Sequence, residues 1–153
     1  MLTRTAEHAL RAVLFLARHG DERPVSAETI AAALNAPANY LAKTLGTLAN
    51  AGIVRGRRGP RGGYRLVTPP DRLTIAEVTD IFEPEHGISS CLLGGRMCDP
   101  RTPCEAHFRW VAVRDAAREP LRSTTIADLL AAPRPIERTT RNDDDLVKLL
   151  YLV

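Results

Sequence analysis

The chain has 153 residues, a formal net charge of +3 and three cysteines. This length suits one domain with a hydrophobic core and an added assembly element, and it excludes two large independent domains. No stretch is long and apolar enough for a membrane span or a secretory signal, so we expect a cytoplasmic protein, in which an odd cysteine count favours metal or redox chemistry over disulfides.

The charge is divided unevenly along the chain. Residues 1–70 hold ten Lys/Arg and four Asp/Glu, whereas residues 71–153 hold eleven and fourteen. A basic first half is typical of a module that binds a polyanion, attached here to a part with a different role.

The basic half predicts three helices. Apolar residues recur at helical spacing over residues 5–19, Ser26 can cap a second helix to about Leu34, and a third follows Pro37 to about Asn50. Two helices joined by a tight turn form a helix-turn-helix, whose second helix can enter the major groove of DNA. The polar outer face of that helix consists of Asn39, Tyr40, Lys43, Thr44 and Thr47.

A β-hairpin is predicted directly after these helices. Residues 53–55 and 64–67 are strand-like, and the tip between them is rich in arginine and glycine. Arginine binds phosphates or enters a narrow minor groove, so we favour a DNA-contacting wing over a solvated charged loop. Its candidate contact residues are Arg55, Arg57, Arg58, Gly59, Pro60 and Arg61.

Capping boxes predict two further helices beyond the hairpin. Thr74 and Glu77 open one helix, which ends at the breaking sequence of residues 83–87, and Thr125 with Asp128 caps a short final helix.

A long helix is predicted between these two. Thr102, Pro103 and Glu105 form its start, and it reaches about Glu119. Its apolar residues lie on most sides of the helix, so two of its faces must be covered. One small domain can hardly do this, and a partner subunit is the economical explanation.

The three cysteines lie in one short segment as Cys91, Cys98 and Cys104, followed by His107. Three thiolates and an imidazole can close around a metal centre. Cys104 is expected in the first turn of the long helix, where the dipole and free amides favour a thiolate. An iron–sulfur cluster is favoured over a zinc site, a metal-free thiol switch and three buried thiols.

Catalytic motifs are scarce. The sequence has no C-x-x-C pair, phosphate loop or nucleophile motif, so no enzymatic activity is expected. A thiol oxidoreductase is the rival from another class, and turnover of a dithiol or peroxide substrate would support it.

Over about residues 2–132 the chain resembles the winged-helix iron–sulfur regulators of the IscR and NsrR type. The similarity rests on the starting sequence LTRTAEHALRA, the helix over residues 39–52, the wing RRGPRGGYRL and the cysteine segment ending in CEAHFRW. It implies a mainly α winged helix-turn-helix and a homodimer joined through the long helix. The dimer would bind a pseudo-palindromic DNA operator and sense redox, nitric oxide or iron–sulfur status.

The resemblance also implies roles for single residues. Asn39 and Lys43 fall on major-groove positions, and Arg58, Gly59 and Pro60 fall on the wing motif.

The cluster site is implied in the same way. Cys91, Cys98 and Cys104 match the cluster cysteines, and [2Fe–2S] is favoured over [4Fe–4S]. The fourth ligand is either His107, as in the IscR-like branch, or Glu7, which stands where NsrR-like members use an acidic ligand from the partner subunit.

We therefore expect four regions. They are a winged helix-turn-helix domain in 1–84, a cysteine loop in 85–104, the dimerisation helix and final short helix in 105–132, and a flexible tail in 133–153.

Overall fold

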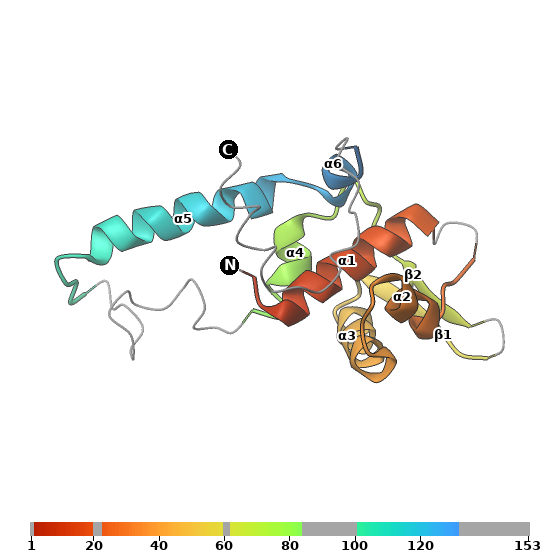
Figure 1. The fold of residues 1–153 in the computed structure, drawn as a ribbon. Helices are drawn as coiled ribbons and strands as arrows, with labels where there is room; N and C mark the ends of the chain where they lie inside the picture. Colours follow the sequence, from red (N-terminus) through yellow and green to blue (C-terminus); the bar gives the residue numbers. More distant parts are fainter. Residues whose placement is uncertain (1, 20–22, 60–61, 84–100, 132–153) are drawn as a thin grey trace.

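The computed structural model describes residues 2–19, 23–59, 62–83 and 101–131. No helix in these ranges is long and apolar enough to cross a membrane. The mainly α winged helix-turn-helix that the sequence predicts is confirmed (Figure 1). Its elements are α1 Arg4–His19, α2 Ala27–Ala33, α3 Ala38–Asn50, β1 Val54–Arg57, β2 Gly63–Leu66, α4 Ile75–Thr79, α5 His107–Ser123 and α6 Ile126–Ala131.

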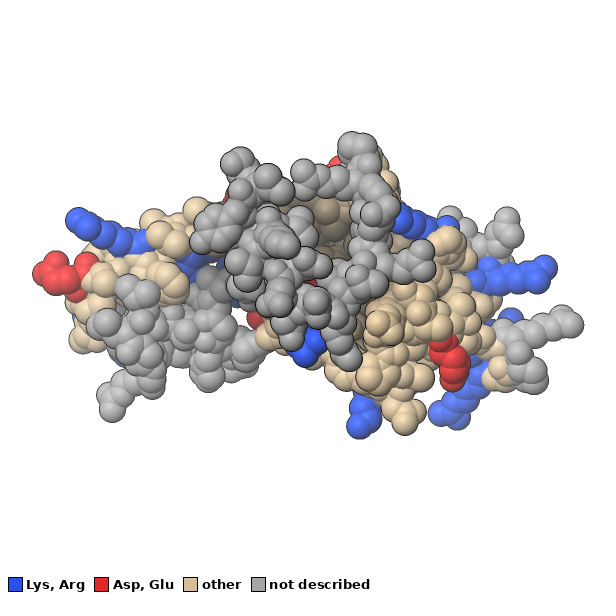
Figure 2. Space-filling view, in the orientation of Figure 1, with Lys and Arg blue, Asp and Glu red and all other residues tan. Residues whose placement is uncertain are grey.

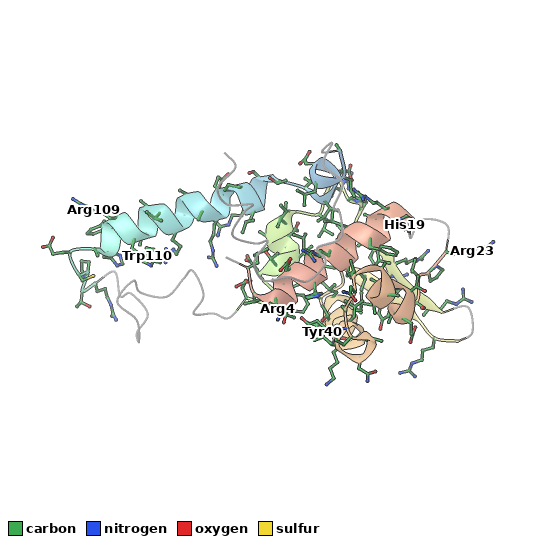
Figure 3. The ribbon with its side chains drawn as sticks, in the orientation of Figure 1. Arg4, His19, Arg23, Tyr40, Arg109 and Trp110 are labelled. Atoms are coloured by element: carbon green, nitrogen blue, oxygen red, sulfur yellow. The ribbon has the colours of Figure 1, made fainter. Side chains whose placement is uncertain are left out.

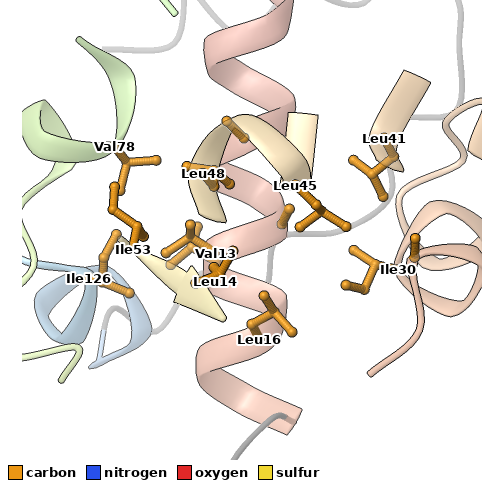
Figure 4. Packing of buried hydrophobic residues seen from close by; sticks show 14 of the residues in the cluster. Val13, Leu14, Leu16, Ile30, Leu41, Leu45, Leu48, Ile53, Val78 and Ile126 are labelled. Carbon is orange, nitrogen blue, oxygen red and sulfur yellow. The ribbon is translucent and has the colours of Figure 1, made fainter. Parts of the chain in front are cut away.

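Helix α1 lies at the centre of the winged domain, and the other elements pack around it (Figure 4). The leucines of α3 recur at helical spacing, so one stripe of that helix faces the core and the opposite stripe faces solvent. Ile126 of α6 is fully buried in the same core, although it lies far along the chain. The largest fully buried side chains include Leu16, Ile30, Leu41, Leu45, Leu48, Leu73, Ile126, Val13, Val54 and Val78.

Three predicted helix caps are present. The hydroxyl of Ser26 accepts the amide of Thr29 at the start of α2. Thr74 and Glu77 form a reciprocal capping box at α4, and Thr125 with Asp128 does the same before α6. Each cap satisfies amides that the first helical turn leaves unpaired, so these short helices begin at defined residues.

The predicted start of the long helix is wrong. α5 begins at His107, so Cys104 precedes the helix instead of lying in its first turn. The His107 amide donates to the Cys104 carbonyl at 2.9 Å, and Thr102, Pro103, Cys104 and Glu105 are exposed. A capping box contributes only about 1 kcal/mol, and no packing holds an extra turn here.

The predicted end of α5 is also wrong, because the helix continues through Pro120 to Ser123. Proline removes one amide and clashes with the preceding turn, so a proline at this position would ordinarily end the helix. The following turn is held instead by its own bonds: the Thr124 amide donates to the Pro120 carbonyl at 3.1 Å, and the Ser123 hydroxyl donates to the Glu119 carbonyl at 2.8 Å.

The C-terminal end of α5 is fastened to the winged domain, while the rest of the helix projects from it (Figure 1). The Ile75 amide donates to the Thr124 carbonyl at 3.0 Å, and the Ile126 amide donates to the Leu73 carbonyl at 2.8 Å. These bonds join the start of α4 to the chain between α5 and α6. A movement of α5 would therefore act first on α4, which packs against α1.

Candidate DNA-binding surface and metal site

Helix α3 presents a stripe of polar side chains to solvent. Leu41, Leu45 and Leu48 are buried against the domain, which leaves Asn39, Lys43 and Thr47 on the exposed stripe. These side chains are placed as the outer face of a recognition helix requires.

Thr44 does not belong to this outer face, in contrast to the prediction. Its side chain is buried, and its hydroxyl donates to the Tyr40 carbonyl at 3.1 Å within the same helix. Thr44 follows Leu41 by three positions and precedes Leu48 by four, so it lies on the core stripe. Tyr40 is half-buried, and its ring meets the edge of the His8 ring at a centroid distance of 5.5 Å.

The hairpin β1–β2 forms the wing. Its antiparallel register places Arg55 directly opposite Arg65, and both side chains are exposed. Like charges at directly opposed positions destabilise a hairpin, so this pairing disfavours a purely structural role. It favours the binding of an anion that neutralises both guanidinium groups.

A third backbone segment supports the wing. Val25, just before α2, exchanges two hydrogen bonds with Tyr64, at 2.9 and 2.7 Å. Gly63 has φ of +147°, and a side chain there would meet the Val25 carbonyl at 2.5 Å. The wing is therefore attached to the helix-turn-helix at a point where only glycine fits.

The remaining predicted wing residues lie around its tip. Arg57 and Arg58 are exposed, and Gly59 has φ of +111°. Pro60 and Arg61 lie outside the described residues.

Basic side chains project from the lower and right-hand edges of the face in Figure 2, where α3 and the wing lie in Figure 1. Within the described ranges, the following residues form no ion pair: Lys43, Arg55, Arg57, Arg58 and Arg65. No acidic side chain of the described ranges neutralises these charges, which leaves them available to phosphates.

Arg65 is absent from the residues that the sequence predicts as DNA contacts. Recognising Arg65 as a candidate DNA contact requires the strand register, because only the pairing with Arg55 shows that the two arginines share one face of the hairpin. The alternation of Tyr64, Arg65 and Leu66 was the available signal, since it places Arg65 on the outer face of a strand.

At the cysteine segment, the structure describes Cys104 and His107. Cys104 is exposed and not in a disulfide, whereas the His107 side chain is buried, with its ring edge-on to Phe108 at 5.1 Å. Cys91 and Cys98 lie outside the described residues. In the part of the chain that is described, no three His, Cys, Asp or Glu side chains are grouped to hold a metal.

Glu7 lies on α1 and forms an ion pair with Arg11 one turn later. Its side chain is 47% exposed. Figure 3 shows Arg109 and Trp110, in the first turn of α5, far from Arg4, in the first turn of α1. Within one chain the first turns of α1 and α5 are therefore separated.

A winged helix-turn-helix with an unneutralised basic outer surface defines a DNA-binding protein. Residues 2–132 match Rrf2, a family described as an iron-dependent transcriptional regulator, and the chain belongs to this family. The HTH-type transcriptional regulator CymR of Bacillus subtilis is 32% identical over 122 residues, covering 80% of this chain and 83% of CymR. IscR of Vibrio vulnificus, also an HTH-type transcriptional regulator, is 30% identical over 146 residues, covering 95% of this chain and 86% of IscR.

Solved structures show the same fold. The structure of B. subtilis CymR, described as the global cysteine regulator, matches with a TM-score of 0.68 and 29% identity, covering 84% of this chain and 95% of CymR. T. potens IscR matches with a TM-score of 0.68 and 26% identity, covering 85% of each chain. The predicted family resemblance is thus confirmed, and the chain is a DNA-binding transcription regulator.

Proposed function

We propose that a homodimer of this chain binds a pseudo-palindromic DNA operator and that an iron–sulfur cluster on its cysteine segment controls this binding. α3 would enter the major groove, and the wing would lie on the neighbouring backbone or minor groove. The DNA docking rests on one observation: Arg55 and Arg65 lie directly opposite each other on the wing, and neither forms an ion pair within the described ranges. Asn39 and Lys43 would contact base edges or phosphates from the exposed stripe of α3.

The donor set fits a cluster in its chemistry. Cys91, Cys98 and Cys104 would supply thiolates, the ligands that hold iron–sulfur clusters, and Cys104 is exposed and free to bind. A bound cluster would supply a group that is sensitive to redox state, nitric oxide and iron supply, with [2Fe–2S] favoured over [4Fe–4S].

Two residues compete for the fourth position. His107 lies next to Cys104 in the same chain, but its ring is buried and would have to rotate outward. Glu7 is half-exposed and would have to leave Arg11, and it would serve as a ligand donated by the partner subunit.

α5 supports the homodimer. Only His107 of this helix is buried, whereas Phe108 is 71% and Val113 58% exposed. Large exposed apolar groups on a projecting helix are typical of an interface. A second copy of the same helix would cover them with the same residues, as two-fold symmetry requires.

The route from the cysteine segment to DNA follows the packing of the helices. Ligation at Cys104 would fix the chain just before α5, and the far end of α5 is fastened to α4 through Thr124 and Ile75. α4 packs on α1, and α1 packs on α3. A rotation of α5 would thus change the spacing of the two α3 helices, whose half-sites lie about 34 Å apart.

A metal-free thiol switch is the second candidate. The exposed thiol of Cys104 favours it, as does the likeness to a regulator described as a cysteine regulator.

Anaerobic purification with an absorption spectrum and iron and sulfide analysis separates these candidates. The proposal expects a coloured protein that contains iron and sulfide, and Cys104→Ser should lose both. A colourless protein after expression with adequate iron would reject the cluster and leave DNA binding intact. Cluster retention in His107→Ala and Glu7→Ala then identifies the fourth ligand.

The DNA docking is tested by binding measurements. Lys43→Ala and Arg58→Ala should weaken binding to the operator, whereas Arg72→Ala, which removes an exposed arginine in the turn before α4, should bind like the parent chain. If the first two variants also bind like the parent, the docking is wrong.

A further inference from the structure

A basic side chain outside both α3 and the wing lies beside the recognition helix. Arg4 is the first residue of α1, is exposed and forms no ion pair within the described ranges. Figure 3 shows Arg4 next to Tyr40, at the end of α3 where that helix begins. The proposed docking of α3 and the wing gives Arg4 no role.

His8 fixes the position of Arg4 relative to α3. Its Nδ1 donates to the Arg4 carbonyl at 2.7 Å, which requires the proton on Nδ1 because a carbonyl can only accept. The same ring packs edge-on against Tyr40, with an interplanar angle of 84°. The first turn of α1 is thereby held against the first turn of α3.

The acidic groups near Arg4 are already engaged. Glu7 pairs with Arg11, and the Glu83 carboxylate accepts the Thr3 amide at 2.8 Å. Neither of these carboxylates forms an ion pair with the Arg4 guanidinium. The positive end of the α1 dipole adds to the attraction for an anion at this position.

The position of Arg4 is opposite to that of the wing. In Figure 1 the start of α1 lies on one side of α3, and the hairpin β1–β2 lies on the other. The major groove is about 12 Å wide and is bounded by two phosphate backbones, so a helix that lies in it has one backbone on each side. The wing would serve one backbone and leave the second without a basic partner.

We propose that Arg4 binds a backbone phosphate of DNA on the side of α3 opposite to the wing, with His8 as the residue that positions it. The inference rests on the proposed docking of α3 in the major groove. A phosphate contact positions the protein on the duplex without reading sequence, so Arg4 contributes to affinity for every duplex alike.

Binding of the full chain to a mixed-sequence duplex of about three helical turns, followed by fluorescence anisotropy over a series of salt concentrations, tests this role. Arg4→Ala should weaken binding several-fold and reduce the slope of log K against log salt by about 0.9 for each contacting subunit. Arg4→Lys should keep most of the slope because it keeps the charge. Arg72→Ala is the matched control and should keep the slope of the parent.

An Arg4→Ala variant with the affinity and slope of the parent would overturn the inference. If Lys43→Ala and Arg58→Ala weaken binding in the same assay, only the role of Arg4 is lost. If those variants also bind like the parent, the docking of α3 and the wing fails as well. Equal thermal unfolding of all variants shows that the comparison concerns binding and not folding.

Discussion

Thr3 and Glu83 are hydrogen-bonded across 80 residues of sequence: the Thr3 amide donates to the Glu83 carboxylate at 2.8 Å. The Thr3 hydroxyl also donates to the carbonyl of Phe82. Glu83 is the last described residue before the cysteine segment, and it is fixed to Thr3, the residue that precedes α1. The helix that carries Glu7 and Arg4 thus shares an anchor with the proposed sensor.

Loss of the Glu83 carboxylate should loosen this anchor. Glu83→Ala leaves the Thr3 amide without its charged acceptor, which we expect to lower the free energy of unfolding by about 1 kcal/mol and Tm by a few degrees. Differential scanning calorimetry measures the change. Asp80→Ala, which removes an exposed acid at the end of α4, is the control and should leave Tm unchanged. Equal Tm values for both variants would contradict the role of this bond.

A side chain at Gly63 should detach the wing. Gly63→Ala places a Cβ 2.5 Å from the Val25 carbonyl at a φ of +147°, so we expect a loss of about 1–3 kcal/mol in stability and weaker DNA binding. Gly46→Ala is the opposite case, because no atom lies within 4 Å of the added Cβ in the middle of α3 apart from its chain neighbours and the backbone of the helix itself. It should raise stability by about 0.5–1 kcal/mol. Urea unfolding of both variants measures whether the free energy of unfolding falls for Gly63→Ala and rises for Gly46→Ala.

The burial of Thr44 predicts which α3 side chains matter for DNA. Thr44→Val keeps the shape of the side chain and removes only a hydroxyl that bonds within the helix. We expect its DNA affinity to stay within about twofold of the parent, while Lys43→Ala weakens binding by the loss of a phosphate or base contact. Anisotropy titrations of the two neighbouring variants test this, and a larger effect at Thr44 would show that α3 turns in the complex.

The cap of α6 should make the stability of the folded chain depend on pH in the acidic range. Hydrogen bonds from the Thr125 backbone amide and then from its hydroxyl hold the pKa of Asp128 below the ordinary aspartate value of 3.8. A lowered carboxyl pKa stabilises the folded chain fully above the unfolded value and loses this contribution as pH falls through the folded value. Tm of the parent should therefore fall more steeply below pH 3.8 than Tm of Asp128→Asn. Asp71→Asn, at an exposed turn position, should follow the parent.

The exposed valine of α5 tests the homodimer. Val113→Glu places a charge on the apolar surface, so a dimer that buries this residue should dissociate at concentrations where the parent is associated. Val67→Glu changes an exposed valine beyond the wing and should leave association unchanged. Sedimentation velocity distinguishes the two species, and an intact dimer in Val113→Glu would move the interface away from this residue.

Local signals in the sequence were sufficient for the winged domain. The leucines of α3 and the caps at Ser26 and Thr74 each act within about one helical turn, so their patterns predict helices that the structure confirms. The basic hairpin after α3 was predictable because strands and tip are contiguous in sequence.

Features that depend on packing could not be read in the same way. Whether the side chain of Thr44 points inward is decided by the angle at which α3 meets the core. The start of α5 at His107 reflects the burial of its ring, against which a capping box at Thr102 is weak. Arg65 and Arg4 gain their meaning from register and from the approach of α1 to α3, which are relations between distant segments.

The return of the chain at Thr124 makes the winged domain discontinuous. The first part of this domain reaches Glu83, and its second part begins where the Thr124 carbonyl accepts the Ile75 amide and where Ile126 fills the core. The sequence between Glu83 and Thr124 thus separates two parts of one folding unit, and both junctions are anchored. Insertions between anchored ends can be exchanged with small loss of stability, because loop-closure entropy changes slowly with length. A different sensor module spliced between Glu83 and Thr124 should leave the DNA-binding domain folded.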